Sequence, residues 1–419
     1  MKMANYAQLA QKYHTPLFVY NFDAITQSYT TLKECFEGYK SLICYALKAN
    51  SNLSLIRHLA NLGSGADCVS FHEVRRALLS GIPKYKIIFS GVGKTLHEIE
   101  SALKADILFL NVESESELFL VEAVAKDLGV EARISLRVNP NVDAKTHPYI
   151  STGLSSNKFG INHEEAFKLY LHAHKSPNLL PVGIHFHIGS QILDSAPLIE
   201  SALKIKELAR GLLALGLPLK FFDIGGGYGI TYTDEVPFNL QEYIKNIINI
   251  VKPLDLSILT EPGRFLVGNA GILLTSVLYE KLNGTKRFVI VDAAMNDLIR
   301  PSIYKAKHEI VALNPKSKEV SKCDVVGAIC ESGDYLAKDV NLPDCESGDL
   351  LIVKSAGAYG YSMSSNYNSR LRPAEVALTN GKDTLIRHRE SFEELIEDEL
   401  LLLDENTDKV DDIKGSKDV

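Results

Sequence analysis

A lysine and a set of anion-binding positions are the residues of this sequence best suited to chemistry. Lys48 ends an apolar run at residues 42–47, and an amine there can attack a carbonyl to form a Schiff base. Three later runs end in glycine, small or hydroxyl residues, whose backbone N–H groups can approach an anion closely, and one end adds an arginine. These ends are residues 187–190, 225–227 and 261–264. Together they predict a phosphorylated ligand held opposite a reactive lysine.

The elements that must position these residues are short β-branched runs that alternate with amphipathic segments. The runs are nearly continuous in Val, Ile, Leu and Phe, which is typical of parallel strands buried on both faces. There are eight, at residues 42–47, 66–69, 87–89, 107–112, 132–138, 182–187, 221–224 and 256–260. Eight units fit a closed (β/α)8 TIM barrel better than the alternative, an open doubly wound sheet. In such a barrel the strands' carboxyl ends form one catalytic face, so the ends named above would meet there.

The pattern changes after about residue 270. Strand-like runs follow one another without long helices, at residues 288–291, 323–329, 350–354, 374–378 and 384–387. Asn380-Gly381 indicates a tight hairpin between the last two. We predict a mainly antiparallel β domain that could also take a spare N-terminal strand at residues 17–20. Ser391 and Glu394 form a capping box that starts a final helix, ending near residue 403.

These patterns give an expected domain organisation. It comprises an N-terminal segment 1–30 that contributes its strand to the β domain, a barrel domain 31–268, a C-terminal β domain 269–403, and a tail 404–419. The tail is rich in charge and almost without apolar residues, so we expect it to be disordered.

The composition is that of an ordinary globular protein. The 419 residues are 46% apolar and 23% charged, with a net charge of 45 − 52 = −7. These values argue against a disordered, collagenous or multi-span membrane protein. The mild negative net charge does not provide the excess of basic residues that nucleic-acid binding needs. We see neither the apolar stretch of a signal peptide nor a run of ~18–20 apolar residues. The six cysteines form no CxxC pair, so we expect reduced thiols and a cytoplasmic protein without nucleic-acid or membrane partners.

The nature of the phosphorylated ligand follows partly by exclusion. A G-x-G-x-x-G dinucleotide site fits poorly, because after Gly225 and Gly227 the third glycine would fall at Ile230. A Schiff-base lysine opposite a phosphate cradle is what pyridoxal phosphate (PLP) requires. We therefore predict PLP as the cofactor and no metal. Desolvation beside the cofactor is expected to lower the pKa of Lys48 toward the neutral amine that attacks a carbonyl.

Long motifs support this prediction. Residues 45–50 (YALKAN), 187–191 (HIGSQ), 225–230 (GGGYGI) and 261–264 (EPGR) resemble the motif set of the fold-type III PLP-dependent decarboxylases, which are related to alanine racemase. Within that group, residues 143–153 (DAKTHPYISTG), 292–304 (DAAMNDLIRPSIY) and 357–368 (GAYGYSMSSNYN) resemble the diaminopimelate decarboxylases. The resemblance extends from about residue 15 to about residue 390. It implies removal of a carboxylate from meso-2,6-diaminopimelate to give L-lysine and CO2, the last step of lysine biosynthesis.

The resemblance also implies roles toward the cofactor. Lys48 would bind it covalently, His187 would stack on its ring, and Glu261 would face the pyridine nitrogen. A racemase on this scaffold typically offers an arginine there, so Glu261 favours decarboxylation. The phosphate cradle would consist of Ser190, Gly225, Gly226, Gly227, Gly263, Arg264 and Tyr359. His185 is interpreted as structural.

On the substrate side, the resemblance implies contacts from Arg264, Arg300, Tyr304 and Tyr359, with Glu331 holding the distal ammonium. Cys330 would protonate Cα after CO2 leaves, acting in the active site of the neighbouring subunit of a homodimer. The sequence Cys-Glu-Ser-Gly-Asp occurs at residues 330–334 and again at residues 345–349, and we assign the second copy no chemistry. Two alternatives remain: a decarboxylase of another basic or polyamine-related amino acid, and a non-catalytic PLP-binding regulatory protein. The presence of both Lys48 and Cys330 argues against the second.

Overall fold

Eight parallel strands close into a barrel in sequence order, with β2 completing the ring against β9. The computed structural model describes residues 6–144, 152–153, 157–315 and 317–403. The barrel strands are β2 (Ser41–Ala46), β3 (Gly65–Cys68), β4 (Ile87–Phe89), β5 (Phe109–Val112), β6 (Ala132–Arg137), β7 (Leu179–His185), β8 (Phe221–Asp223) and β9 (Ser257–Thr260). The predicted TIM barrel is therefore confirmed, and the open sheet is excluded.

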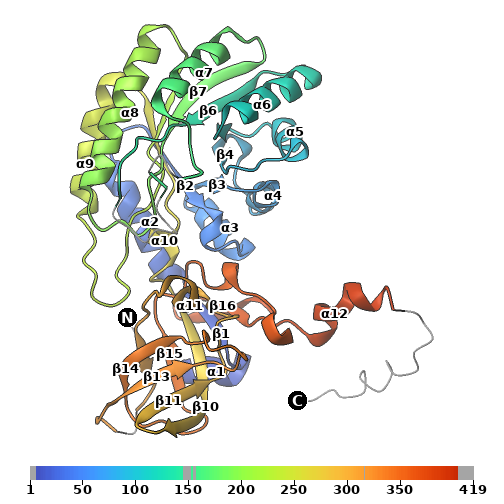
Figure 1. Cartoon of the computed structure of the whole chain (residues 1–419), viewed down its shortest axis with the longest axis vertical. Coiled ribbons are helices and arrows are strands. Elements are labelled where there is room, and N and C mark those ends of the chain that lie inside the picture. Colours follow the sequence, from blue (N-terminus) through green and yellow to red (C-terminus); the bar gives the residue numbers. More distant parts are fainter. Residues whose placement is uncertain (1–5, 145–151, 154–156, 316, 404–419) are drawn as a thin grey trace.

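Helices surround the barrel strands (Figure 1). They are α2 (Phe22–Cys35), α3 (Leu53–Asn61), α4 (Phe71–Leu79), α5 (Leu96–Ala105), α6 (Glu115–Leu128), α7 (His163–Lys175), α8 (Ala196–Ala214), α9 (Leu240–Val251) and the short α10 (Arg264–Val267). Five of them share one start signal, in which a Ser, Thr or Asn side chain accepts the backbone N–H of a glutamate three residues on. The capping residues are Ser70, Thr95, Ser114, Asn162 and Asn239. Such a cap satisfies an otherwise unpaired N–H and places the glutamate at the positive end of the helix.

The second domain is a nine-stranded sheet with the path β14-β13-β11-β10-β1-β16-β17, and β15 pairs with β10 and β12. Its strands are β1 (Leu17–Asn21), β10 (Gly271–Asn283), β11 (Lys286–Val291), β12 (Ile310–Ala312), β13 (Ser321–Val326), β14 (Ala337–Leu342), β15 (Leu350–Val353), β16 (Ala374–Thr379) and β17 (Lys382–Arg387). Two pairs, β1 with β16 and β11 with β13, are parallel, and the others are antiparallel. The mainly antiparallel domain and its use of the N-terminal strand are confirmed.

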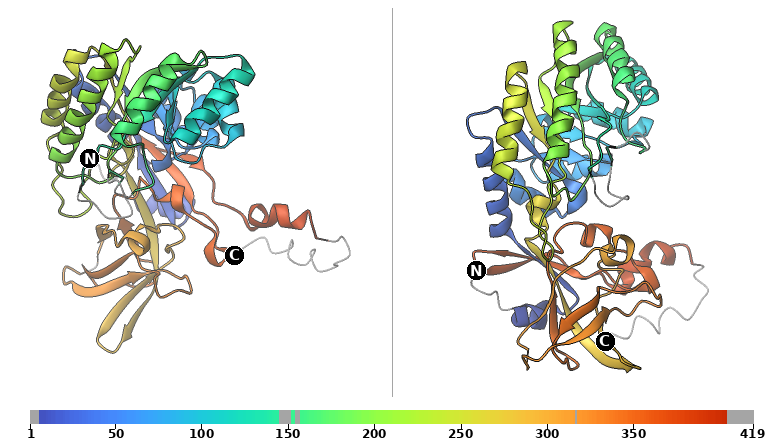
Figure 2. Two further views of the ribbon diagram at one scale, coloured as in Figure 1. Left: turned by 45° about the horizontal axis from the view of Figure 1, so that its top comes forward. Right: turned by 60° about the vertical axis from the view of Figure 1, so that its left-hand side comes forward.

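The β domain contains elements that the sequence patterns did not predict. Among them are the strands β10, β12 and β14 and the helix α1 (Tyr6–Tyr13), which precedes β1. The final helix α12 (Phe392–Leu400) begins with the predicted capping box of Ser391 and Glu394. It projects to one side of the molecule (Figure 2). The expected tail 404–419 and most of the motif at 143–153 lie outside the described residues.

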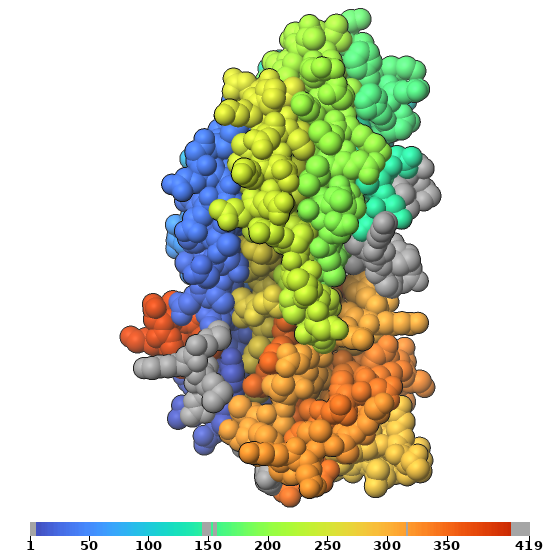
Figure 3. Space-filling model, turned by 90° about the vertical axis from the view of Figure 1, so that its left-hand side faces the viewer, coloured from blue at the N-terminus to red at the C-terminus, as the bar shows by residue number. Residues whose placement is uncertain are grey.

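The two domains meet at the carboxyl ends of the barrel strands, and the space-filling view shows the orange β domain packed beneath the barrel helices (Figure 3). The loop after β15 makes part of this contact. The Tyr359 N–H donates to the Ala49 carbonyl at 2.8 Å, and Asn50 Nδ2 donates to the Gly357 carbonyl at 3.3 Å. The β domain therefore covers the face on which Lys48 lies. No helix among the described residues is long and apolar enough to cross a membrane.

Candidate active site

A cavity of about 360 Å³ lies at this junction, lined by residues from both domains. Ten of the predicted site residues line it: Lys48, His187, Ser190, Gly227, Glu261, Gly263, Arg264, Arg300, Tyr304 and Tyr359. The other four, Gly225, Gly226, Cys330 and Glu331, do not. Arg300 and Tyr304 come from α11 (Arg300–Tyr304), which follows β11 in the β domain. The cavity thus brings together residues that are more than 300 positions apart in the chain.

Lys48 lies in a 3₁₀ turn (Leu47–Ala49) directly after β2, and its Nζ is 3.2 Å from Oδ2 of Asp67 at the end of β3. Asp67 is fully buried, and its Oδ1 accepts a hydrogen bond from Ser90 Oγ at 2.7 Å. Burial lowers the pKa of Lys48, but the neighbouring acidic groups, Asp67 foremost, outweigh it, so the net shift is upward. Desolvation thus acts in the expected direction, but the neighbouring acidic groups outweigh it, and the lowered pKa of Lys48 beside bound PLP stays a prediction.

Replacing Asp67 by asparagine is expected to lower the pKa of Lys48, because the substitution removes the nearest negative charge while keeping a polar side chain. A lower pKa increases the neutral fraction of the amine at any given pH. The pH profile for attachment of added PLP to the cofactor-free protein should therefore shift to lower pH. Stopped-flow absorbance of the Schiff base measures this rate. An unchanged or upward-shifted profile would contradict the electrostatic account.

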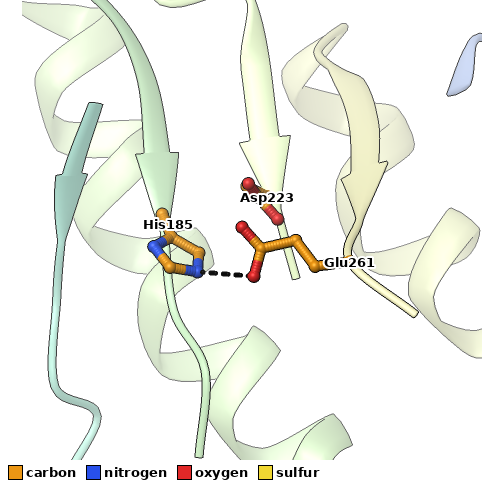
Figure 4. Close-up of side chains that lie close together, drawn as sticks. All are labelled: His185, Asp223 and Glu261. Carbon is orange, nitrogen blue, oxygen red and sulfur yellow. Dashed lines mark ion pairs between the residues drawn. The ribbon is translucent and has the colours of Figure 1, made fainter. Parts of the chain in front are cut away.

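Glu261 follows β9 and lies beside His185 of β7 and Asp223 of β8 (Figure 4). His185 Nε2 is 3.4 Å from Glu261 Oε2, and Asn111 Nδ2 donates to Glu261 Oε1 at 3.4 Å. Ligand atoms of His185, Asp223 and Glu261 lie within 4.8 Å of one another, a spacing that could also hold a metal ion. His185, which the sequence analysis left as structural, is therefore a neighbour of the key carboxylate.

The electrostatics of this cluster concentrate negative charge on Glu261. Burial raises the pKa of Glu261, but His185 and Lys48 more than reverse this, so the net shift is downward. In contrast, burial and the charge of Glu261 raise the pKa values of Asp67 and Asp223. Neighbouring carboxyl groups whose pKa values are pushed apart take different roles. Glu261 is thus suited to stay ionised toward the cavity.

The glycine run after β8 shapes a loop as well as the cavity wall. Gly225 and Gly227 have φ angles of +61° and +96°, and a Cβ on Gly226 would lie 2.1 Å from the Glu261 carbonyl oxygen. The Gly226 N–H donates to His187 Nδ1 at 3.2 Å, which places the proton of the neutral ring on Nε2. Burial and then Arg137 lower the pKa of His187 well below its usual value. Of the three glycines, only Gly227 lines the cavity.

Two buried arginines face the cavity without an acidic partner. Arg264 and Arg300 are only 6% and 5% exposed, and neither forms an ion pair with a carboxylate among the described residues. Arg137, which lines the same cavity, pairs with Glu113 at 2.8 Å. The Nε atoms of Arg264 and Arg300 also lack a hydrogen-bond partner in the described chain. An uncompensated buried cation is costly, so these arginines are suited to bind anionic groups.

Aromatic rings hold both guanidinium groups. Arg264 lies 4.9 Å from the ring centre of Tyr359 and donates to Ser190 Oγ at 3.0 Å and to the Tyr232 hydroxyl. Arg300 lies 4.4 Å from the ring centre of Tyr232. Burial lowers the pKa of Arg300 to about 10, so the group remains charged at neutral pH. One residue, Tyr232, thus contacts both buried guanidinium groups.

The repeated Cys-Glu-Ser-Gly-Asp sequence has two different environments. Cys330 is exposed and lies outside the cavity, with its backbone N–H donating to Asn368 Oδ1 at 2.9 Å. Cys345 is buried, its Sγ lies 3.2 Å from the Pro343 carbonyl, and burial raises the pKa of its thiol. Of the two, only Cys330 is accessible to another molecule.

Several residues that shape the site were not among those predicted from the sequence. Asp67 and Asp223 carried a usable signal, because each is an acidic residue at the end of an otherwise apolar strand. Tyr232 and His308 carried none, since they lie in segments between predicted elements. Only the folded chain brings them to Arg300.

Comparisons with known proteins agree with this geometry. Residues 22–268 match the family described as pyridoxal-dependent decarboxylase, pyridoxal binding domain. Diaminopimelate decarboxylase of Helicobacter pylori strain J99 is 56% identical over 394 residues, covering 94% of this chain and 97% of that protein. Its Campylobacter jejuni counterpart is 57% identical, covering 94% and 98%. A crystal structure of the Helicobacter pylori enzyme complexed with L-lysine has a TM-score of 0.93 and 55% identity, covering 95% of this chain and 100% of that one. The chain therefore belongs to the pyridoxal-dependent decarboxylases and, within them, to the diaminopimelate decarboxylases.

Proposed function

We propose that the chain converts meso-2,6-diaminopimelate into L-lysine and CO2 with PLP held in the central cavity. The observation that carries this proposal is the pair of buried arginines without carboxylate partners, which face the same cavity as Lys48 and Glu261. One arginine would serve the cofactor phosphate and the other a substrate carboxylate, since a guanidinium can bind both carboxylate oxygens. A substrate without a second carboxylate would leave Arg300 unused.

The residues of the cavity fit PLP. Lys48 would bind PLP covalently, and Glu261 would place a negative charge beside the pyridine nitrogen. The neutral ring of His187 would stack on the face of the pyridine ring. Ser190, Gly227, Gly263, Arg264 and Tyr359 would hold the phosphate, while Gly225 and Gly226 would shape the loop behind them. The cofactor supplies an electron sink that allows the bond between Cα and the carboxylate to break. Ionised Glu261 strengthens that sink by favouring a protonated pyridine nitrogen.

The substrate would be oriented by the β domain. Arg300 would bind the distal carboxylate, with Tyr304, Tyr359 and Arg264 nearby, and this fixes the other amino-acid centre at Lys48. Glu331 would hold the distal ammonium, and the Cys330 thiol would give its proton to Cα. Cys330 and Glu331 are absent from the wall of this subunit's own cavity, which supports their action in a partner's site.

The assembly proposed here is a homodimer with two shared active sites, because two-fold symmetry would let each subunit give Cys330 and Glu331 to the other. A cytoplasmic location is also proposed, supported by six unpaired cysteines, which suit a reducing compartment. We also propose the domain organisation expected from the sequence. It consists of an N-terminal segment 1–30, a barrel domain 31–268, a β domain 269–403 and a C-terminal tail 404–419.

Purified protein with added PLP is expected to release CO2 from meso-diaminopimelate and to form L-lysine in equal amount. L-lysine, ornithine and arginine should release at least about 100-fold less, because each has a single carboxylate and cannot place one at the reacting centre and another at Arg300 at the same time. Trapped CO2 and amino-acid chromatography measure both products. Preferential turnover of ornithine or arginine would identify the alternative decarboxylase. Cofactor binding with no turnover of any of them would indicate the non-catalytic alternative.

A further inference from the structure

We infer that His308 is a positioning residue that fixes the Arg300 guanidinium for a substrate carboxylate while leaving its positive charge available. This inference rests on the proposed function, because it assumes that Arg300 binds a carboxylate. His308 itself is 2% exposed and does not line the cavity. It lies behind Arg300, in the segment between α11 and β12.

The hydrogen bonds define the state of the imidazole. His308 Nδ1 is 2.8 Å from the Lys354 carbonyl oxygen, and a carbonyl can only accept, so Nδ1 carries the proton. His308 Nε2 is 2.7 Å from Nη1 of Arg300, which can only donate, so Nε2 presents its lone pair. Both contacts are satisfied only by the neutral tautomer protonated on Nδ1. Burial and then the charge of Arg300 lower the pKa of His308 to about 3, in agreement with a neutral ring.

A neutral partner has a specific advantage over an acidic one. Arg137 in the same cavity is held by the carboxylate of Glu113, which compensates its charge. Arg300 is held by an imidazole at one Nη and by the ring of Tyr232 at 4.4 Å, and neither group neutralises it. His308 also packs edge-on against Tyr232, with ring centres 5.1 Å apart. The guanidinium is thereby oriented in advance, so less conformational entropy is lost when a carboxylate binds.

Two substitutions separate the two hydrogen bonds. Asparagine places its amide N–H₂ near the position of Nδ1 and can still donate to Lys354, but it loses the acceptor for Arg300. Glutamine reaches the position of Nε2 and can supply an oxygen acceptor to Arg300. In the PLP-loaded enzyme, His308→Asn should raise KM for meso-diaminopimelate about tenfold, with kcat changed less than about twofold, whereas His308→Gln should stay near wild type.

Product binding gives a readout that does not depend on turnover. L-lysine keeps the carboxylate that Arg300 is proposed to bind, and cadaverine lacks it. The dissociation constant of L-lysine, measured from the change in PLP absorbance on binding, should rise about tenfold in His308→Asn, and that of cadaverine should not change. Equal weakening of both ligands, or equal behaviour of the asparagine and glutamine variants, would overturn the positioning role.

Further controls separate this inference from the proposed function. Arg300→Gln should weaken L-lysine at least as much as His308→Asn; if it has no effect, the proposed role of Arg300 fails. If Arg300→Gln weakens L-lysine but His308→Asn does not, only the role of His308 fails. Nitrogen-15 NMR of the histidine side chains in the wild-type enzyme tests the tautomer of His308 and needs no substituted protein. A buried His308 protonated on Nε2 or on both nitrogens would contradict the inference.

Discussion

Replacing Lys48 by arginine is expected to abolish turnover, with a loss on the order of 10³-fold or more, the scale seen when a covalent catalytic group is removed. Arginine keeps a cation beside Asp67, whose oxygen is 3.2 Å from the lysine amine, so the buried carboxyl group is not left alone. A guanidinium stays protonated and cannot attack the cofactor's carbonyl. The variant should therefore lose the Schiff-base absorbance near ~420 nm while keeping its fold.

The measurement combines activity, absorbance and thermal unfolding of the purified protein with added PLP. Borohydride reduction of the wild type, followed by peptide mapping, should locate the cofactor on Lys48. Lys94 provides a matched control for the mapping, because it is buried and paired with Glu117 at 2.7 Å, and it should remain unlabelled. Label on another lysine, or a Schiff-base band that persists in Lys48→Arg, would contradict the assignment.

The barrel could be predicted from the sequence because its strands are buried on both faces. Such strands are continuous apolar runs, and amphipathic helices with clear start signals separate them. The β domain was harder, because strands such as β14 and β17 have few buried residues and carry only a weak apolar pattern. In β14 most residues are not buried, so it does not stand out as an apolar run. The first half of β10 is apolar and largely buried, and it is a strand signal that the prediction overlooked. Their pairing is set by tertiary partners rather than by local pattern.

The site was predictable to the extent that it is built from strand ends. The rule that active sites lie at the carboxyl ends of barrel strands led to Lys48, His187 and Glu261. It did not predict the raised pKa of Lys48, because that shift comes from Asp67 on the next strand. It also could not place Tyr232 and His308 beside Arg300, since Tyr232 comes from a barrel loop that meets the β domain and His308 lies in the irregular segment after α11.

Replacing Cys330 by alanine is expected to lower kcat by about 10² to 10⁴-fold, the usual effect of losing a positioned proton donor. The Schiff-base band should persist, because Lys48 and the other proposed cofactor ligands remain. Cys345→Ala is the matched control, since that thiol is in the second copy of the same five-residue sequence but is buried beside Pro343. The Cys345 variant should retain wild-type turnover. Loss of activity in Cys345→Ala but not in Cys330→Ala would reverse the assignment of the two copies.

Mixing Cys330→Ala with Lys48→Arg tests whether the thiol acts across a subunit boundary. Alone, Lys48→Arg should be inactive and Cys330→Ala should keep at most about 1% of wild-type turnover. If one subunit supplies Lys48 and its partner supplies Cys330, each mixed dimer contains one intact site out of two. Random exchange makes about half of the dimers mixed, so about a quarter of wild-type activity should return. If Cys330 acted within its own subunit, every site in a mixed dimer would lack one group and no activity would return. The exposed position of Cys330, outside its own subunit's cavity, is the reason to expect recovery.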